Sequence, residues 1–320
     1  MFRPTPHPVL RVPTAEEIGR MDGAYLKQKM IDREKRIREE RANPFVICYE
    51  PPIWTVCDAI LGFDWVPLEL ADRIRFKFGF KKAKDVLLIN GGNRGGKTHY
   101  AAHRVMRILR RKREARAWCC HSTQSMSVQY HHTLMHQLLP PEWAAADVRS
   151  KTAYIAYKQK TGFSEGKFVL PPAEPGVRGS ECEFLSYDMN PERIEGGNLD
   201  IIWDDELVPP DWVETQEFRI AERNGKIIIT FTPIKGYSAT VKLFQDGARV
   251  CQESIGYLLP RDGQPPDLAR ALGLSEGQLA ELWAAEAGEE VNGKRQPRAA
   301  TAPQSEPEKC LEWIAHDEAV

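Results

Sequence analysis

The 320-residue sequence lacks long apolar runs, a targeting segment and the CxxC pairs typical of metal-binding cysteines. None of its apolar runs approaches the ~20 residues that a membrane helix needs. The proline-rich start, residues 1–13, lacks the apolar core of a signal peptide. The seven cysteines are odd in number and include no CxxC pair, which argues against a disulfide framework or a zinc site. These absences favour an intracellular protein that is not secreted and has no membrane partner.

An excess of positive charge is also missing, because the formal net charge is −1. Contact with nucleic acid would therefore come from local patches rather than from the field of the whole protein. One candidate is residues 104–116, RVMRILRRKREAR, where seven cations fall within thirteen residues. We interpret this segment either as the solvated end of a helix, which the helix dipole favours, or as a contact for DNA phosphates.

Local patterns divide the chain into three parts. Residues 1–42 combine a proline-rich arm with a charged helix. Residues 43–250 alternate short apolar runs with helical patterns, which predicts an α/β domain with a mostly parallel sheet. Residues 251–320 predict a small helical appendage with a flexible linker. The main buried strands are expected at residues 85–90, 117–122, 182–188, 199–206 and 226–233.

The segment GGNRGGKT matches the phosphate-loop pattern G-x-x-x-x-G-K-[ST] between an apolar run and a helical pattern. Glycines let successive backbone N–H groups point at phosphate oxygens, and the helix start adds a positive end. The lysine of such a loop reaches the β- and γ-phosphates, and the following hydroxyl binds Mg²⁺. The motif predicts ATP and Mg²⁺ as cofactors. The expected nucleotide-binding residues are Gly91, Gly92, Asn93, Arg94, Gly95, Gly96, Lys97 and Thr98.

Three acids end the apolar run LDIIWDDE. A P-loop ATPase needs one strand-end carboxylate for Mg²⁺ and one to orient the attacking water. We assign Asp205 to the metal and Glu206 to the water. Side chains alternate along a strand, so Asp204 would share a face with Glu206, and a pairing of these two is the alternative.

A third motif, IIITFTPIKG, places Thr230, Thr232 and Pro233 at the end of another apolar run. Hydroxyls at this position can report whether the γ-phosphate is present. An ordinary threonine-rich strand end is the alternative interpretation.

Together these three motifs, over roughly residues 45–245, resemble the ATPase domain of phage large terminases, the motors that package DNA into procapsids. The resemblance implies a RecA-like P-loop fold of the additional-strand, catalytic-glutamate type. It implies that Arg94 senses the γ-phosphate, that Glu206 acts with Lys97 in hydrolysis, and that residues 230–233 couple hydrolysis to movement. An arginine finger is also implied, and the candidates are Arg178, Arg219 and Arg223. Tyr49 and Trp54 lie where the adenine-binding segment of the family would be.

The resemblance further implies an ATPase that moves double-stranded DNA, forms a homo-oligomeric ring and docks on a portal protein with a small terminase subunit. Its expected place is the portal vertex of a procapsid in the host cytoplasm. The sequence departs from the family pattern because only 87 residues follow Pro233, without strands that end in aspartate. No nuclease activity is therefore expected, and a separate nuclease polypeptide or a shortened relic are the two explanations. The rival functions are a helicase-like or repair ATPase and a non-hydrolysing nucleotide switch or scaffold.

Overall fold

The computed structural model describes residues 50–91, 96–145, 148–172, 177–189, 197–206, 208–232 and 267–284, together with a few isolated positions. Within this part of the chain, one eight-stranded sheet runs in the order β1-β10-β9-β2-β8-β7-β4-β3, and β5 pairs separately with β6. The first five strands in that order are parallel, and the last three add antiparallel. The strands are β1 (Val86–Asn90), β2 (Arg116–His121), β3 (Val148–Arg149), β4 (Tyr154–Ile155), β5 (Tyr157–Lys158), β6 (Gly162–Phe163), β7 (Lys167–Val169), β8 (Glu181–Ser186), β9 (Ile201–Asp205) and β10 (Lys226–Phe231).

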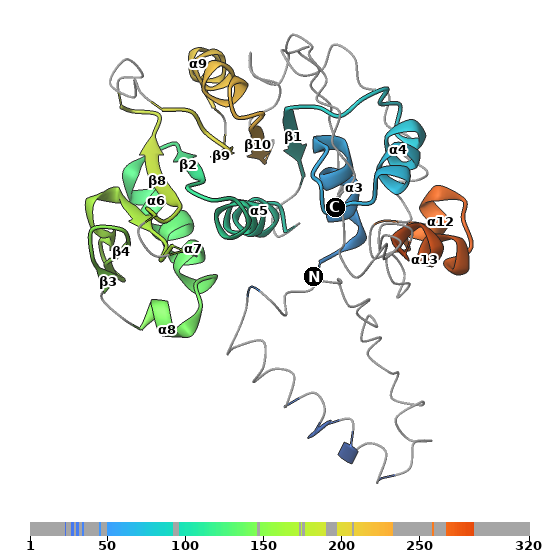
Figure 1. The fold of residues 1–320 in the computed structure, drawn as a ribbon, viewed down its shortest axis with the longest axis horizontal. Helices are drawn as coiled ribbons and strands as arrows, with labels where there is room; N and C mark the ends of the chain where they lie inside the picture. Colours follow the sequence, from blue (N-terminus) through green and yellow to red (C-terminus); the bar gives the residue numbers. More distant parts are fainter. Residues whose placement is uncertain are drawn as a thin grey trace.

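Helices cover both faces of the parallel strands, and α5 and α9 lie on opposite sides (Figure 1). A sheet covered in this way needs strands that are apolar on both faces, and β1, β9 and β10 are buried along their whole length. The helices are α3 (Pro52–Leu61), α4 (Leu68–Lys77), α5 (Lys97–Arg111), α6 (Gln124–Ser127), the π-helix η1 (Val128–His132), α7 (Thr133–Gln137), α8 (Pro141–Ala144), the 3₁₀ helix η2 (Ser164–Gly166), α9 (Pro210–Ala221), α12 (Leu268–Leu272) and α13 (Glu276–Ala284). The predicted α/β fold with a mostly parallel sheet is confirmed.

The order of the strands carries the functional information. β10 inserts between β1, which precedes the phosphate loop, and β9, which ends in the acids. This is the additional-strand arrangement of a RecA-like P-loop ATPase. The predicted helix over residues 98–116 is shorter than expected, because α5 ends at Arg111 and β2 already begins at Arg116.

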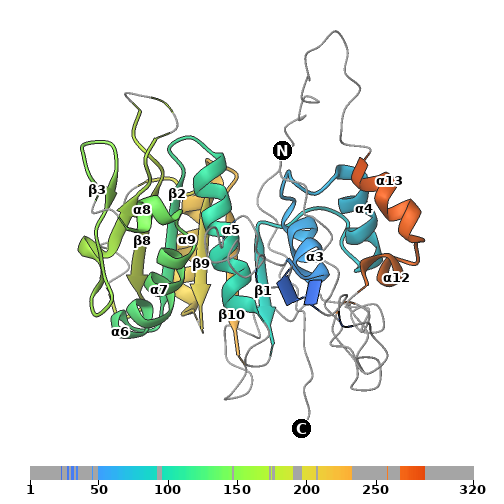
Figure 2. The same ribbon diagram turned by 90° about the horizontal axis from the view of Figure 1, so that it is seen from below.

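The helices α3 and α4 form a layer beside β1, and α12 and α13 pack against the outer side of α4 (Figure 2). Of the expected 251–320 appendage, the structure thus shows two helices, and most of the remainder lies outside the described residues. Ser275 caps α13: the Ser275 hydroxyl accepts from the Gln278 N–H at 3.2 Å, and the Gln278 side chain accepts from the Ser275 N–H at 2.9 Å. None of the described helices is both long and apolar enough to cross a bilayer.

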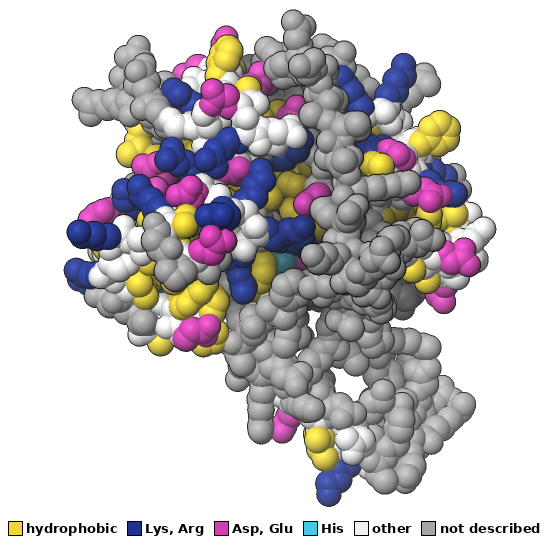
Figure 3. All heavy atoms as spheres, in the orientation of Figure 1, with side chains coloured by type: hydrophobic (Ala, Val, Ile, Leu, Met, Phe, Trp, Pro, Cys, Tyr) yellow, Lys and Arg dark blue, Asp and Glu magenta, His cyan; other side chains and the backbone are white. Residues whose placement is uncertain are grey.

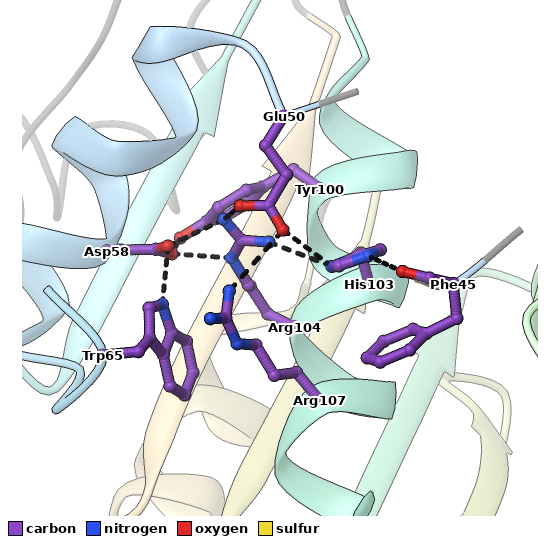
Figure 4. A network of polar contacts seen from close by, with 8 residues as sticks. All are labelled: Phe45, Glu50, Asp58, Trp65, Tyr100, His103, Arg104 and Arg107. Atoms are coloured by element: carbon purple, nitrogen blue, oxygen red, sulfur yellow. Dashed lines mark hydrogen bonds and ion pairs between the residues drawn. The ribbon is translucent and has the colours of Figure 1, made fainter. Parts of the chain in front are cut away.

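A buried ion pair joins the helix after the phosphate loop to this layer (Figure 4). The guanidinium of Arg104 on α5 is fully buried and donates two hydrogen bonds of 2.7 Å to the carboxylate of Asp58 on α3. Trp65 and Tyr100 donate two more, at 2.8 and 2.9 Å, so Asp58 accepts four hydrogen bonds. The same Nη2 of Arg104 that donates to Asp58 also donates to Glu50 at 3.0 Å. For Arg104, both sequence interpretations of residues 104–116 are therefore wrong, because this cation neither is solvated nor can reach DNA.

Candidate nucleotide-binding site

Three neighbouring strands end at one edge of the sheet. In the parallel ladder, Thr230 of β10 lies opposite Ile89 of β1 on one side and Asp205 of β9 on the other. The carboxyl ends of parallel strands are the usual place for ligand sites in α/β folds. The register therefore brings the end of the loop strand, the acids and the threonine-rich strand end to one place.

The helix α5 begins at this edge. Gly96 has a φ of 80°, in the left-handed region that favours glycine, and Lys97 is the first helical residue. The Lys97 ammonium donates to the Gly91 carbonyl at 2.7 Å, and the Gly91 N–H donates to the Phe231 carbonyl at 3.2 Å. Thr98 lies half-buried in the first turn. The remaining predicted loop residues, Gly92, Asn93, Arg94 and Gly95, lie outside the described residues.

Charge links Lys97 to the acids. Burial lowers the pKa of Lys97, and the negative charges of Asp205 and Glu206 oppose that shift. The lysine and both acids therefore belong to one electrostatic cluster, as the sequence predicts for a nucleotide site.

Asp205 points to the face of the sheet that α5 covers. One of its oxygens accepts a 2.6 Å hydrogen bond from the Thr230 hydroxyl, and the other lies 3.4 Å from His131 Nε2. Burial favours a raised pKa for this carboxyl, but contact with His131 and Thr230 outweighs it and holds the pKa below its usual value. Asp205 is therefore an ionised carboxylate, the form that can bind a cation.

Asp204 points to the opposite face, toward α9. Its Oδ1 accepts hydrogen bonds from the Gln216 amide at 2.8 Å and from the Tyr187 hydroxyl at 3.3 Å. Burial raises the pKa of Asp204 to about 7, although these hydrogen bonds work against the shift. The alternative that pairs Asp204 with Glu206 at the metal is therefore not supported, because the Asp204 carboxyl faces α9, on the side of the sheet away from α5.

Glu206 follows β9 with a φ of 66°, which is unusual for a residue other than glycine. Its N–H donates to the Thr230 carbonyl at 2.8 Å and fixes this conformation. Burial and the charge of Asp205 raise the pKa of the half-buried Glu206 carboxyl, and Lys97 partly offsets them. A raised pKa makes a carboxylate a better proton acceptor.

The Thr230 hydroxyl is fully buried, and its single proton is already donated, so none is left for a phosphate oxygen. It accepts from the Trp203 indole N–H at 2.9 Å and donates to Asp205. Thr230 therefore acts on the site through Asp205 rather than by touching a phosphate. Thr232 lies half-buried beyond the end of β10, and Pro233 lies outside the described residues.

None of the three candidate arginine fingers lies at this edge. Arg223 pairs at 2.6 Å with Asp200, which precedes β9, and Arg178 pairs at 2.8 Å with Glu181, which begins β8. The Arg219 carbonyl accepts from the N–H of Leu199, also before β9. All three positions are at the amino edge of the sheet, away from Lys97 and the acids of the same chain.

Trp54 is also placed differently from the prediction. Its ring is buried in α3, edge-on to Tyr100 at a centroid distance of 5.6 Å and 5.1 Å from the Arg104 guanidinium. This side chain packs in the core, so the predicted adenine contact at Trp54 is wrong. Tyr49 lies outside the described residues.

No family model and no curated protein matches this chain. The solved structures that match are phage large terminases. The large terminase ATPase domain of Thermus phage P74-26 is 18% identical, with a TM-score of 0.40, over 56% of this chain and 75% of that one. The large terminase of a second, thermophilic bacteriophage is 14% identical, with a TM-score of 0.36, over 51% of this chain and 38% of that one. The HK97 bacteriophage large terminase is 14% identical, with a TM-score of 0.39, over 74% and 51% of the two chains. The present chain thus spans about half or less of the latter two proteins, and a further structure of the thermophilic-phage protein is a complex with ADP.

Histidines are the part of the site that sequence reasoning missed. The sequence draws attention to His132 and His136 by their spacing, but His132 accepts from the Phe163 N–H and His136 contacts the Ala144 carbonyl. The histidine beside the acids is His131, and the nearest signal for it is the adjacent pair in VQYHH. The π-helix η1 turns His131 toward β9, which a regular helical period does not predict.

The buried Asp204 makes stability depend on pH. Its folded-state pKa is about 7 against an ordinary 3.8, so between these values the folded state binds more protons than the unfolded state. The free energy of unfolding therefore falls as pH rises through this window, by up to about 1.4 kcal/mol per pH unit for this one group. We expect Asp204→Asn to remove this slope, measured by urea unfolding from pH 4.5 to 7.5. A wild-type slope equal to that of the variant would contradict the assignment.

Proposed function

We propose that this chain is the ATP-hydrolysing motor subunit that packages double-stranded viral DNA into procapsids, a large terminase ATPase. The observation that carries the proposal is the meeting of Lys97, Asp205 and Glu206 at the carboxyl edge of β1, β10 and β9. A lysine at a helix start beside two acids is the arrangement that a P-loop ATPase needs. The terminase assignment within that class rests on the sequence motifs, with β10 as the coupling strand.

The residues present fit a Mg²⁺-bound triphosphate. Asp205 is ionised, and Thr98 offers a hydroxyl in the first turn of α5, so these two side chains would hold the cation. Bound Mg²⁺ supplies positive charge that neutralises the phosphates. Lys97 would exchange its hydrogen bond with the Gly91 carbonyl for contact with phosphate oxygens.

Glu206 would act on the attacking water. The half-buried carboxylate accepts the water proton while the water oxygen bonds to the γ-phosphorus and the bond to ADP breaks. Its raised pKa suits this task, because a proton acceptor works best when its pKa lies near the working pH. Thr230 holds the Oδ1 of Asp205 from β10, which gives the coupling strand a direct mechanical link to the cation site.

The proposed partners are double-stranded DNA, a portal protein, a small terminase subunit and further copies of this chain in a ring. On the face in Figure 3, Lys and Arg side chains of the described residues lie among Asp and Glu side chains. Among the ion pairs of the described residues, Arg178 and Lys167 both pair with Glu181. Association with DNA on this face would therefore depend on a mixed surface, and we expect it to be weak without the portal.

The deciding experiment is ATP hydrolysis by the purified chain, with and without double-stranded DNA and portal. The motor proposal expects turnover that rises with DNA or portal. Turnover together with strand separation would favour a helicase-like ATPase. Binding of ATP without turnover in any of these conditions would leave the switch or scaffold as the better description.

Lys97→Ala tests the nucleotide site itself. Loss of a charge-assisted hydrogen bond to phosphate is worth about 1.5–3 kcal/mol, so we expect the dissociation constant for ATP to rise about 10- to 150-fold. Lys160→Ala removes an exposed lysine and is the matched control. Calorimetric titration of Mg-ATP measures both, and equal affinities for the two variants would contradict the assignment of Lys97.

A further inference from the structure

Two histidines and one acid meet beside the proposed nucleotide site. His121 ends β2, His131 lies in the π-helix η1, and Asp205 ends β9. All three side chains are buried, and one ligand atom from each lies within 4.8 Å of the others. Three different elements thus bring one ligand atom each within reach of a single ion.

His131 lacks the hydrogen bonds that a buried imidazole normally makes. Its side chain is fully buried, and neither ring nitrogen has a hydrogen-bond partner among the residues that the structure describes. Nε2 approaches Asp205 Oδ2 to 3.4 Å without hydrogen-bond alignment, and the ring packs on Trp203 at a centroid distance of 3.9 Å. Buried polar groups without partners are rare in proteins, so this one points to a ligand.

Asp205 and His121 each make a hydrogen bond on the side away from the proposed ion. The Thr230 hydroxyl bonds Asp205 Oδ1, which leaves Oδ2 toward His131. Nδ1 of His121 lies 3.0 Å from the Ser122 hydroxyl, which leaves Nε2 for a ligand. In a bound state Nδ1 would donate to that hydroxyl, and the Ser122 N–H would give up its present bond to Nδ1. Outer contacts of this kind orient the ligands of metal sites.

We propose that His121, His131 and Asp205 bind a divalent transition-metal ion of the Zn²⁺ type. Two imidazoles and one carboxylate are a common ligand set for zinc and related ions, whereas Mg²⁺ prefers oxygen ligands alone. Three protein ligands leave a fourth position for water. Zinc binding is not part of the proposed function, but the zinc site would share Asp205 with the proposed Mg²⁺ site. If the proposed function holds, zinc competes with Mg-nucleotide for that carboxylate.

The test uses tag-free full-length protein without nucleotide, titrated with Zn²⁺ by calorimetry and with Co²⁺ by visible absorption. We expect one Zn²⁺ per chain in the wild type and the absorption of a low-coordinate Co²⁺ site. Loss of an outer contact alone weakens metal binding about 10- to 100-fold, so His121→Gln and His131→Gln should each weaken it by at least as much. His136→Gln is the matched control, because His136 is a half-buried histidine that lies outside the cluster.

Thermal unfolding separates metal binding from misfolding. Zn²⁺ should raise the Tm of the wild type and of His136→Gln, and should leave the Tm of His131→Gln unchanged. Absence of stoichiometric Zn²⁺ binding in the wild type would overturn the proposal. So would a Zn²⁺ affinity of His131→Gln equal to that of the wild type, or a loss of affinity in His136→Gln as large as that in His131→Gln. Lys97→Ala should bind Zn²⁺ like the wild type, so a failure of nucleotide binding would leave this result unaffected.

Discussion

Glutamine at position 206 is expected to lower kcat for ATP hydrolysis by about 10²- to 10⁴-fold, the usual contribution of a general base. The amide keeps the size and shape of the carboxylate but cannot take the proton of the attacking water. Lys97 and Asp205 are untouched, so the dissociation constant of Mg-ATP should change little. The expected variant therefore holds ATP without hydrolysing it, measured by steady-state turnover and by equilibrium binding on the same preparation.

Glu214→Gln is the matched control for this experiment. Glu214 is exposed on α9, and the same chemical change there should leave turnover within about twofold, since exposed substitutions rarely matter. Because the pKa of Glu206 is raised, wild-type turnover should also increase with pH as this carboxyl ionises. If Glu206→Gln and Glu214→Gln turned over ATP equally well, Glu206 would have no role as a base.

Replacing Asp58 with asparagine is expected to lower the free energy of unfolding by about 3–5 kcal/mol, the usual loss when one partner of a buried ion pair is removed. Four donors point at the Asp58 carboxylate, two of them from the fully buried Arg104. An asparagine places an N–H₂ group against two of these donors and leaves Glu50 as the acidic partner of Arg104. Urea unfolding followed by circular dichroism measures the change.

The control for the ion pair is Glu69→Gln on α4. Glu69 pairs with Arg73 at 3.4 Å, one turn apart, and both side chains are more than half exposed. Such pairs contribute only about 0.3–0.5 kcal/mol, so this variant should unfold almost like the wild type. Similar losses for Asp58→Asn and Glu69→Gln would mean that the Arg104 network contributes little to stability.

The sequence predicts most of the parallel sheet, because its strands are continuous apolar runs that end in recognisable motifs. It does not reveal the Arg104–Asp58 pair, because the cations of residues 104–116 look solvated and the partner is 46 residues away. The distance of the candidate arginine fingers from Lys97 and the acids of the same chain has a simpler cause. Arg219 and Arg223 precede β10, and the beginning of a parallel strand lies at the opposite edge of the sheet from its end. Arg219 and Arg223 are therefore close to the coupling motif in the sequence but far from it in the folded chain.

Trp54 and His131 show two ways in which prediction of site residues from the sequence fails. An aromatic residue at a suitable place in the chain looked like a base contact but fills the core, whereas a histidine without a motif lies 3.4 Å from the predicted metal ligand. Both outcomes depend on tertiary packing, which neither spacing nor composition records.

The position of β10 has a mechanical consequence. It is bonded to β1 on one side and β9 on the other, with Thr230 in register with Ile89 and Asp205. A displacement of this strand would break two ladders of hydrogen bonds at once, which makes the strand ends a stiff frame. Under the proposed function, Asp205 and Thr230 would therefore keep their positions during a catalytic cycle. A movement driven by nucleotide turnover would then have to occur in segments beyond the ends of these strands, while the strands themselves stay in place.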